Sequence, residues 1–346
     1  MTFKTFLVSV IALFTLLSCD NELNVTADFR TIPVIYALID GNVETNYIRV
    51  EKGFIDPTIG GLDIAQRPDS LYFGSEVLVR ITNMRTNKAV ILDRVNLEDE
   101  GFTREDGIFA TQPNIAYKLN IEDLELQQNE MLKFELIDAS DNVMTSAESM
   151  VIGEFTLSNT QPVDPIRFIE DSDANFGIRS DEQAAAIFDL RLYINYLEED
   201  LQTGTSEEKV LEWVIETGLP RTRTSAGGNF RSQVVFSFDG IEFYQFLGGA
   251  ITDAPEDENR FIRTFVGIDL RYDAGGQDLA DYINIGNANT GITSNQIIPT
   301  FTNFSNDAVG VFSSRTTIRN VLPYGINTAT LDSLRDGRFT EQLNFN

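Results

Sequence analysis

Residues 187–196 read IFDLRLYINY, and a large apolar side chain occupies every second position from Phe188 to Tyr196. Side chains of a β-strand point alternately to the two faces of its sheet, so this period of two predicts a half-buried strand rather than a helix. The intervening positions, among them Asp189, Arg191 and Asn195, then lie on the polar face.

The same period of two recurs through the first half of the chain and predicts a β-sandwich there. Residues 56–70 hold two prolines and a Gly-Gly pair, which predicts a long loop. Many short strands without a long amphipathic helix are typical of an antiparallel sandwich, so residues 31–158 are predicted to form an immunoglobulin-like module. Its predicted strands are 31–39, 46–54, 76–82, 89–95, 117–121, 131–138 and 150–157.

Residues 158–166, with Pro162 and Pro165, are the best candidate for a linker to a second domain. Residues 166–346 are predicted to be β-rich with a few short helices. Beside 187–196, the predicted strands are 210–216, 231–238, 261–272 and 308–312, with a hairpin loop over 199–207. Four helices are predicted. The first begins at residues 180–183, and the second runs from Asp239 to Leu247 with a stop at Gly248-Gly249. The third lies around residues 278–282, and the fourth runs from 330 to 335 with a stop at Gly337. The predicted fold class is therefore mainly β.

The start of the chain carries an export signal. Lys4 precedes a twelve-residue apolar run, Phe6 to Leu17, which is too short for a membrane-spanning helix but suits a signal peptide. The tetrapeptide Leu16-Leu17-Ser18-Cys19 resembles the lipobox of bacterial lipoproteins, in which signal peptidase II cuts before a lipidated cysteine. Residues 1–18 are then the signal peptide and residues 19–30 a lipidated tether. The alternative is an ordinary signal peptide with a cysteine beside it by chance.

Cys19 is the only cysteine in the chain. A disulfide needs a second cysteine, and a lone thiol is an oxidation liability outside the cytoplasm. A thioether-linked lipid removes that liability, and two or three acyl chains anchor a protein lastingly where one does not. Cys19 is therefore the predicted lipid-attachment site, and the predicted location is the outer membrane, on its periplasmic or its surface face.

The charge and the composition exclude several functions. The net charge is −27, and removal of residues 1–18 takes away only one more positive charge, that of Lys4. Nucleic acid and other polyanions are repelled by such a surface. The chain contains no histidine, so catalytic triads with histidine and His-ligated metal sites cannot form. We therefore expect no enzyme activity, no cofactor and no metal, although a hydrolase that relies on carboxylates alone stays open.

Asp171, Asp173, Asn175 and Glu182 have the spacing of oxygen ligands in a calcium loop. Phe176 replaces the glycine that the turn of such a loop requires, and Arg179 places a positive charge at another ligand position, so an acidic interdomain loop is the preferred interpretation. Other candidates favour structural roles: turns for Gly227-Gly228 and Gly275-Gly276, solvated or paired charges for Arg221-Thr222-Arg223, and core packing for Phe243, Tyr244 and Phe246. Glu198-Glu199 and Glu256-Asp257-Glu258 would serve glycoside hydrolysis only if folding placed them across a cleft.

Several stretches carry a loose resemblance to a family of proteins. They are Pro33-Val34-Ile35-Tyr36, Tyr47-Ile48-Arg49-Val50, Ala274-Gly275-Gly276-Gln277-Asp278-Leu279, Thr302-Asn303-Phe304-Ser305-Asn306 and Gly310-Val311-Phe312-Ser313-Ser314-Arg315. Together with the lipobox, they resemble Bacteroidota envelope lipoproteins of unknown function. Such lipoproteins are commonly encoded beside TonB-dependent receptors. The resemblance implies an accessory role at the outer membrane and carries over no catalytic residue.

Three functions follow as hypotheses from the sequence. The first is a non-catalytic lipoprotein that binds an outer-membrane transporter, such as a TonB-dependent receptor, or an external ligand. The second is an adhesion or structural module of the envelope. The third, ranked last, is a histidine-free hydrolase that acts through carboxylates, which requires two carboxylates about 5–10 Å apart in a cleft.

Overall fold

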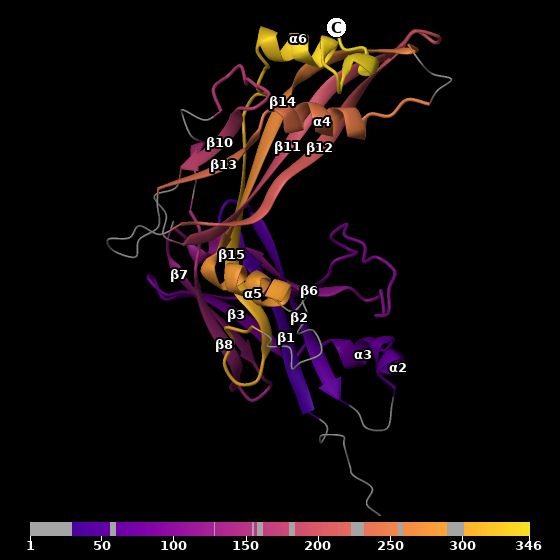
Figure 1. The fold of residues 1–346 in the computed structure, drawn as a ribbon. Coiled ribbons are helices and arrows are strands. Elements are labelled where there is room, and N and C mark those ends of the chain that lie inside the picture. Colours follow the sequence, from indigo (N-terminus) through magenta and orange to yellow (C-terminus); the bar gives the residue numbers. More distant parts are fainter. Residues whose placement is uncertain are drawn as a thin grey trace, which may run out of the picture.

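The computed structural model describes residues 30–55, 60–127, 129–153, 156–157, 162–179, 184–222, 232–254, 259–288 and 301–346. These residues form a mainly β structure with a few short helices, so the predicted fold class is confirmed. Figure 1 shows two lobes, an upper one that contains the C-terminus and a lower one that contains β1 (Arg30–Ile39).

One eight-stranded sheet passes through both lobes (Figure 1). Its upper part consists of three strands of sixteen residues each, and β15 connects this part to the lower strands. The order across the sheet is β12 (Thr205–Pro220), β11 (Ala185–Asp200), β14 (Phe261–Gly276), β15 (Val309–Arg319), β1, β2 (Thr45–Ile55), β6 (Ile115–Asn120) and β5 (Asp93–Asn96).

The lower lobe is a sandwich in which a four-stranded antiparallel sheet packs on the lower strands of the large sheet. Phe134 lies at its centre, with ring centroids 5.3 Å from Phe304 and 5.8 Å from Phe312. The four strands are β4 (Lys88–Ile91), β3 (Leu78–Asn83), β7 (Met131–Ile137) and β8 (Val143–Met150), and the short helices nearby are α2 (Gly61–Ala65), α3 (Pro68–Leu71) and η1 (Ile121–Leu124).

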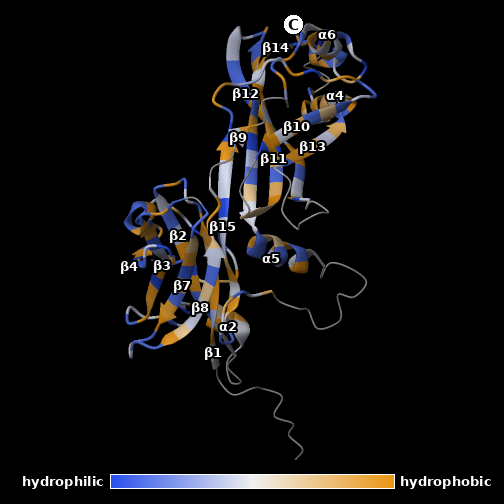
Figure 2. Cartoon of the chain, turned by 90° about the vertical axis from the view of Figure 1, so that its left-hand side faces the viewer, coloured by the Kyte–Doolittle hydropathy of each residue, from blue (hydrophilic) through white to orange (hydrophobic). Residues whose placement is uncertain are grey.

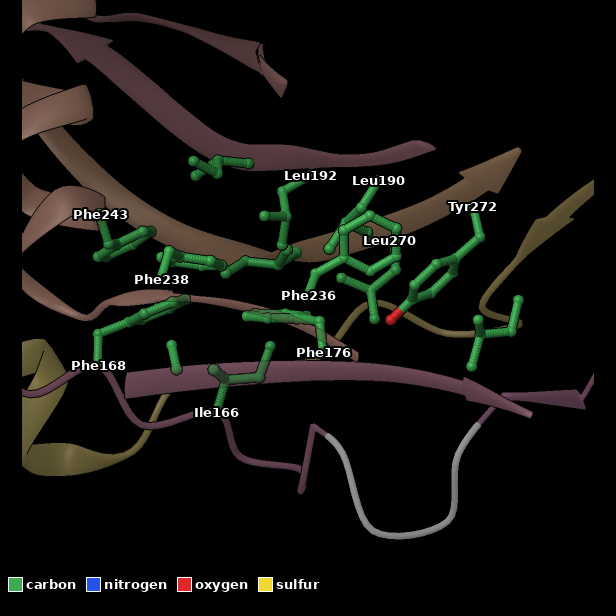
Figure 3. Packing of buried hydrophobic residues seen from close by; sticks show 14 of the residues in the cluster. Ile166, Phe168, Phe176, Leu190, Leu192, Phe236, Phe238, Phe243, Leu270 and Tyr272 are labelled. Carbon is green, nitrogen blue, oxygen red and sulfur yellow. The ribbon is translucent and has the colours of Figure 1, made fainter. Parts of the chain in front are cut away.

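The upper lobe packs a three-stranded sheet and two helices against β11 and β14. Its core is aromatic: Phe168 stacks on Phe243 with a centroid separation of 4.1 Å, and Phe176 stacks on Phe238 at 5.4 Å (Figure 3). The elements are β9 (Thr156–Leu157), β10 (Asp173–Arg179), β13 (Gln233–Asp239), α4 (Ile241–Ala250), α6 (Thr328–Asp336) and η3 (Glu341–Leu343); α5 (Gln277–Ala288) lies where the lobes meet.

Strand β11 confirms the prediction made from residues 187–196. Leu190, Leu192 and Ile194 are fully buried, whereas the residues between them are half-buried. Hydrophobic and hydrophilic residues interchange along the long strands in Figure 2. One face of this strand therefore forms the upper core, and the other face is polar.

The predicted division into 31–158 and 166–346 needs a correction in the C-terminal part. Strand β15 pairs in parallel with β1, from Val34 opposite Val309 to Ile39 opposite Ser314. Phe304 and Phe312 belong to the core of the lower lobe. Residues 302–314 therefore complete the N-terminal sandwich, which makes that sandwich partly parallel, while residues 315–319 pair with β14. A parallel partner returns from a distant part of the chain and leaves no local signal in the sequence.

Four local predictions are also wrong. The predicted loop 56–70 contains α2 and α3, and the predicted strand 89–95 is two strands, β4 and β5, that belong to different sheets on either side of buried Leu92. The predicted strand 150–157 is replaced by β8, which ends at Met150, and the two-residue β9. The hairpin loop predicted over 199–207 is shorter, because β11 continues to Asp200 and β12 begins at Thr205.

Helix α4 passes through the glycines that were predicted to stop it. A Cβ atom on Gly248 would lie 2.3 Å from the backbone oxygen of Phe339, so this glycine lets the C-terminal segment pack directly on the helix. Asp239 accepts a hydrogen bond from the Ile241 N–H at 2.9 Å, but the helix begins at Ile241, two residues later than predicted, with Gly240 as its N-cap. The predicted helix at 330–335 is confirmed as α6, with Asn327 as its N-cap and Gly337 at its end.

Candidate functional site

A cavity of about 510 Å³ lies where the two lobes meet, and we call it the junction cavity. Strands β11, β14 and β15, helix α5 and the turn after β1 all contribute to its wall. Its ionisable lining residues are three arginines and three aspartates: Asp40, Asp189, Arg191, Arg271, Asp273 and Arg315. Its apolar wall includes Leu38, Val43, Ile187, Leu279 and Ile283.

Asp273 lies between two arginines of the polar sheet face. Arg191 Nη1 is 3.3 Å from Asp273 Oδ2, and Arg271 Nε is 2.9 Å from the same oxygen. Arg191 also approaches Glu212 of β12, with 3.2 Å between Nε and Oε1. These side chains keep 22–50% of their surface exposed. The network therefore orders the cavity wall while it stays in contact with water.

Asp40 is the most deeply buried carboxylate of the cavity, with 7% of its surface exposed. Its backbone N–H donates to Asn46 Oδ1 at 2.9 Å, and its carboxylate accepts from the Asn42 N–H at 3.0 Å. Burial raises the pKa of Asp40, and the bond from Asn42 and the charge of Arg315 offset this only in part. A carboxyl group with a raised pKa in a cavity is a candidate for ligand binding or proton transfer.

Arg315 is the cavity arginine that is not committed to a carboxylate. Arg191 and Arg271 both pair with Asp273, whereas Arg315 forms no ion pair with any residue that the structure describes. Its guanidinium acts on Asp40 only through its charge. A planar guanidinium with free donors binds carboxylate or phosphate groups well.

The glycine pair Gly275-Gly276, predicted as a turn, ends strand β14 instead. A Cβ atom on Gly275 would lie 2.9 Å from both Ile187 Cγ2 and Leu279 Cδ2, and one on Gly276 would lie 2.8 Å from Ser313 Oγ. The two glycines therefore allow α5 and β15 to pack closely beside the cavity.

A second cavity of about 540 Å³ lies in the lower lobe, beneath residues 97–105. Arg49 lines it and is committed on two sides, to Glu51 at 3.1 Å and to Asn114 Oδ1 at 2.8 Å. Tyr47 donates to Glu100 at 2.9 Å. This cavity is as large as the junction cavity, but both of its arginines, Arg49 and Arg104, pair with Glu51, so the junction cavity is the better candidate for a ligand site.

The residues singled out in the sequence have mixed outcomes. Cys19, Gly227-Gly228 and Glu256-Asp257-Glu258 lie outside the described residues. The acidic loop predicted over Asp171–Glu182 is wrong for its central part, because residues 173–179 are strand β10 and Asp173 pairs with Asp239; Glu182 lies outside the described residues. Within the described ranges, no group of three or more acidic residues is arranged to hold a metal ion.

The aromatic prediction is confirmed, since Phe243 and Tyr244 are buried and Phe246 stacks on Trp213 with a centroid separation of 5.0 Å. Of the two roles predicted for Arg221, solvated or paired, the first is wrong, because Arg221 is buried; its backbone N–H donates to the Ala186 oxygen at 2.8 Å.

The cavity residues themselves were not predicted as a site. Asp189 and Arg191 were interpreted as the polar face of a strand, and Asp273 directly follows the predicted strand 261–272. The available signal was that charged residues occupy the polar positions of two long strands, but the pairing of Arg191 with Arg271 across β11 and β14 depends on a register that the sequence does not state.

Comparisons with known proteins add little to this picture. No family model and no curated protein matches the chain. Among solved structures, the C-terminal globular domain of an oligosaccharyltransferase from Pyrococcus abyssi matches at 11% identity and a TM-score of 0.24, over 69% of this chain and 45% of that domain. A cytokine receptor complex matches at 10% identity, over 86% of this chain and 99% of that one, with a TM-score of 0.22. CBD12 from CALX1.2 matches at 11% identity, over 83% and 100%, with a TM-score of 0.19.

The matched part of this chain spans less than half of the oligosaccharyltransferase domain. Within the described residues, no helix has the length and apolar character that crossing a bilayer requires.

Proposed function

We propose that this chain is a non-catalytic, lipid-anchored binding protein of the bacterial cell envelope, and that the junction cavity holds a small zwitterionic ligand such as an amino acid or a short peptide. The anchor is Cys19 in its lipobox. The resemblance to Bacteroidota lipoproteins supports an outer-membrane location and an accessory role beside a TonB-dependent receptor.

The observation that carries the ligand proposal is the uncommitted Arg315 beside buried Asp40. Arg315 suits an anionic group of the ligand, and Asp40 suits a cationic group, whose charge would stabilise the carboxylate. Leu279 and Ile283 supply an apolar wall for a side chain. The volume lies within the range of about 300–1,000 Å³ that is common for ligand pockets, which also favour the junctions of domains.

The ligand proposal is tested by the melting temperature of the mature protein in the presence of amino acids, tripeptides, neutral sugars and inorganic phosphate. A ligand at about 100 times its Kd stabilises the folded state by about 2.7 kcal/mol. We expect stabilisation by the zwitterions and none by the neutral sugars. Stabilisation by sugars alone, or by no member of the panel, would contradict the proposed ligand class.

The anchor is tested by fractionation of cells that express Cys19→Ala. We expect the wild-type chain in the membrane fraction and the variant in the soluble envelope fraction, because the lipid is the proposed attachment. A variant that stays membrane-bound after washing with high salt would refute lipid anchoring at Cys19 as the sole attachment.

A hydrolase that acts through carboxylates is the second candidate. Burial and, to a smaller extent, the charge of Asp273 raise the pKa of the Asp40 carboxyl group, and a carboxyl group with a raised pKa suits general acid–base catalysis. The two candidates differ in the fate of a bound peptide. Under the binding proposal, mass spectrometry recovers the peptide intact after long incubation. Turnover that Asp40→Asn abolishes would establish the hydrolase instead.

A further inference from the structure

Strand β12 leaves one side of the large sheet open. It is sixteen residues long and pairs with β11 on one side. No other backbone segment within the described ranges forms hydrogen bonds with its free side. A free edge of this length presents a row of backbone N–H and C=O groups that can pair with another strand.

The other edges of the sheets are short or covered. The opposite edge of the same sheet is β5, with four residues. The edge strand β8 of the lower sheet is covered by residues 303–306, since the Ser305 N–H donates to the Ser146 oxygen at 2.9 Å. The open edge of β12 is thus the longest among the described residues, and natural proteins usually avoid such an edge.

The solvent face of β12 beside this edge has a regular pattern. Glu208, Val210, Glu212 and Val214 pair across the sheet with odd-numbered residues of β11, from Leu197 to Arg191, and so share the outward face. Val210 and Val214 are 59% and 47% exposed. The alternate residues Leu211 and Trp213 point the other way and pack on the upper core.

The pattern argues against pairing with a second copy of this chain. In the register centred on Val210, an antiparallel pair would place Glu208 opposite Glu212 of the second copy, and like charges in opposed positions destabilise a sheet; a pair centred on Leu211 avoids this contact. The net charge of −27 adds to that repulsion. A strand with basic side chains meets neither obstacle.

We propose that the free edge of β12 is an interface at which a partner protein adds an extended strand, with basic residues opposite Glu208 and Glu212 and apolar residues opposite Val210 and Val214. Backbone hydrogen bonds supply the pairing, and the alternating side chains select the partner. This interface meets the junction cavity at one residue, because Arg191 lines the cavity and its Nε lies 3.2 Å from Glu212 Oε1, whereas Glu208 and Val210 do not line the cavity.

The test uses the mature chain and the peptide Lys-Thr-Val-Thr-Lys-Thr-Val-Thr, whose lysines and valines share one face. A control peptide of the same sequence carries a methyl group on every backbone nitrogen, which keeps the charge but leaves no backbone N–H to pair with a strand. We expect the first peptide to slow hydrogen–deuterium exchange in residues 205–214 and the second to bind at least tenfold more weakly. Equal binding of both peptides, or no protection of β12, would overturn the proposal.

Protein variants test the side-chain pattern separately. Glu208→Lys with Glu212→Lys should weaken binding of the first peptide at least tenfold. The matched control is Glu105→Lys with Glu122→Lys, which changes the net charge equally at exposed positions of the lower lobe and should bind like the wild type. Equal loss in both double variants would show non-specific charge attraction. Analytical ultracentrifugation of the wild type tests self-pairing. If the chain dimerises, and hydrogen–deuterium exchange shows that the dimer protects β12, a second copy occupies the edge and the proposal is contradicted.

Discussion

Two clusters of arginines and carboxylates on the same large sheet differ in how completely they are closed. In the upper lobe, Arg263 is 1% exposed, and its guanidinium binds Asp253 through two bonds of 3.0 and 2.6 Å, Glu198 at 2.8 Å and the Leu343 oxygen at 2.9 Å. At the junction cavity, Asp273 is shared by two half-exposed arginines, and Arg315 has no carboxylate partner among the described residues.

The difference separates a structural cluster from a candidate binding cluster. The donors of Arg263 are directed at fixed partners, and its backbone also pairs with Asn344 and Asn346, which attaches the C-terminus to β14. A charge buried this deeply is tolerated only when its partners are complete. The junction cluster keeps donors and one buried carboxylate directed into a cavity, where a ligand can complete them.

The largest expected effect is that of Arg263→Ala. The substitution leaves Asp253 and Glu198 without their partner in a poorly solvated site, so we expect a loss of about 3–5 kcal/mol in the free energy of unfolding. Trp213, the only tryptophan, packs in the upper lobe and reports unfolding in urea by its fluorescence. Arg263→Lys keeps the charge without the forked geometry and should lose less. An unchanged urea midpoint for the alanine variant would contradict the closed cluster.

A smaller effect is expected for Asp273→Asn at the junction. Its partners are partly exposed, so the loss of both ion pairs should cost about 1 kcal/mol or less. The comparable change at an open surface pair is Asp332→Asn beside Arg335, where the side chains are 59% and 44% exposed and we expect no measurable change. If Asp273→Asn destabilised the protein as much as Arg263→Ala, the distinction between the two clusters would fail.

The smallest effect concerns Asp40 and depends on pH. Its pKa is raised on folding, so the folded state binds a proton more readily than the unfolded state, and the stability contributed by this group falls as the pH rises from about 4 through the raised pKa. The Asp40→Asn variant has no titrating carboxyl group at this position, so it does not lose this stability as the pH rises. We therefore expect the variant to be more stable than the wild type at pH 7, with the difference shrinking toward pH 3, as measured by urea unfolding at each pH. If the difference in the free energy of unfolding between the variant and the wild type grows as the pH falls, the prediction is contradicted.

The strands could be predicted from the sequence where one face is buried and the other is polar. The period of two located β11, β14 and β7 within a few residues, because burial on one face repeats at every second residue. The parallel pairing of β15 with β1 could not be predicted, since its partners are separated by 275 positions, as in Val34 and Val309. The cavity depends on that pairing, because it brings Arg315 to the turn that holds Asp40.

The predictions for short elements were wrong for a different reason. Gly248 was predicted to stop helix α4, because glycine has a low helix propensity. The close approach of Phe339 is what requires a glycine at this position of the helix. In residues 171–179, the spacing of acidic side chains suggested a loop, whereas pairing with β13 determines an extended backbone. In both cases a tertiary contact outweighed the local preference.

The most direct test of a ligand-binding junction is a calorimetric titration of the stabilising zwitterion into the wild type, Arg315→Ala and Arg319→Ala. Both arginines are exposed on β15, but only Arg315 lines the cavity, while Arg319 lies 5.8 Å from the ring centre of Tyr193. We predict that Arg315→Ala weakens binding at least tenfold, which corresponds to about 1.4 kcal/mol, and that Arg319→Ala binds like the wild type. Equal affinity in all three proteins would contradict the junction cavity as the binding site.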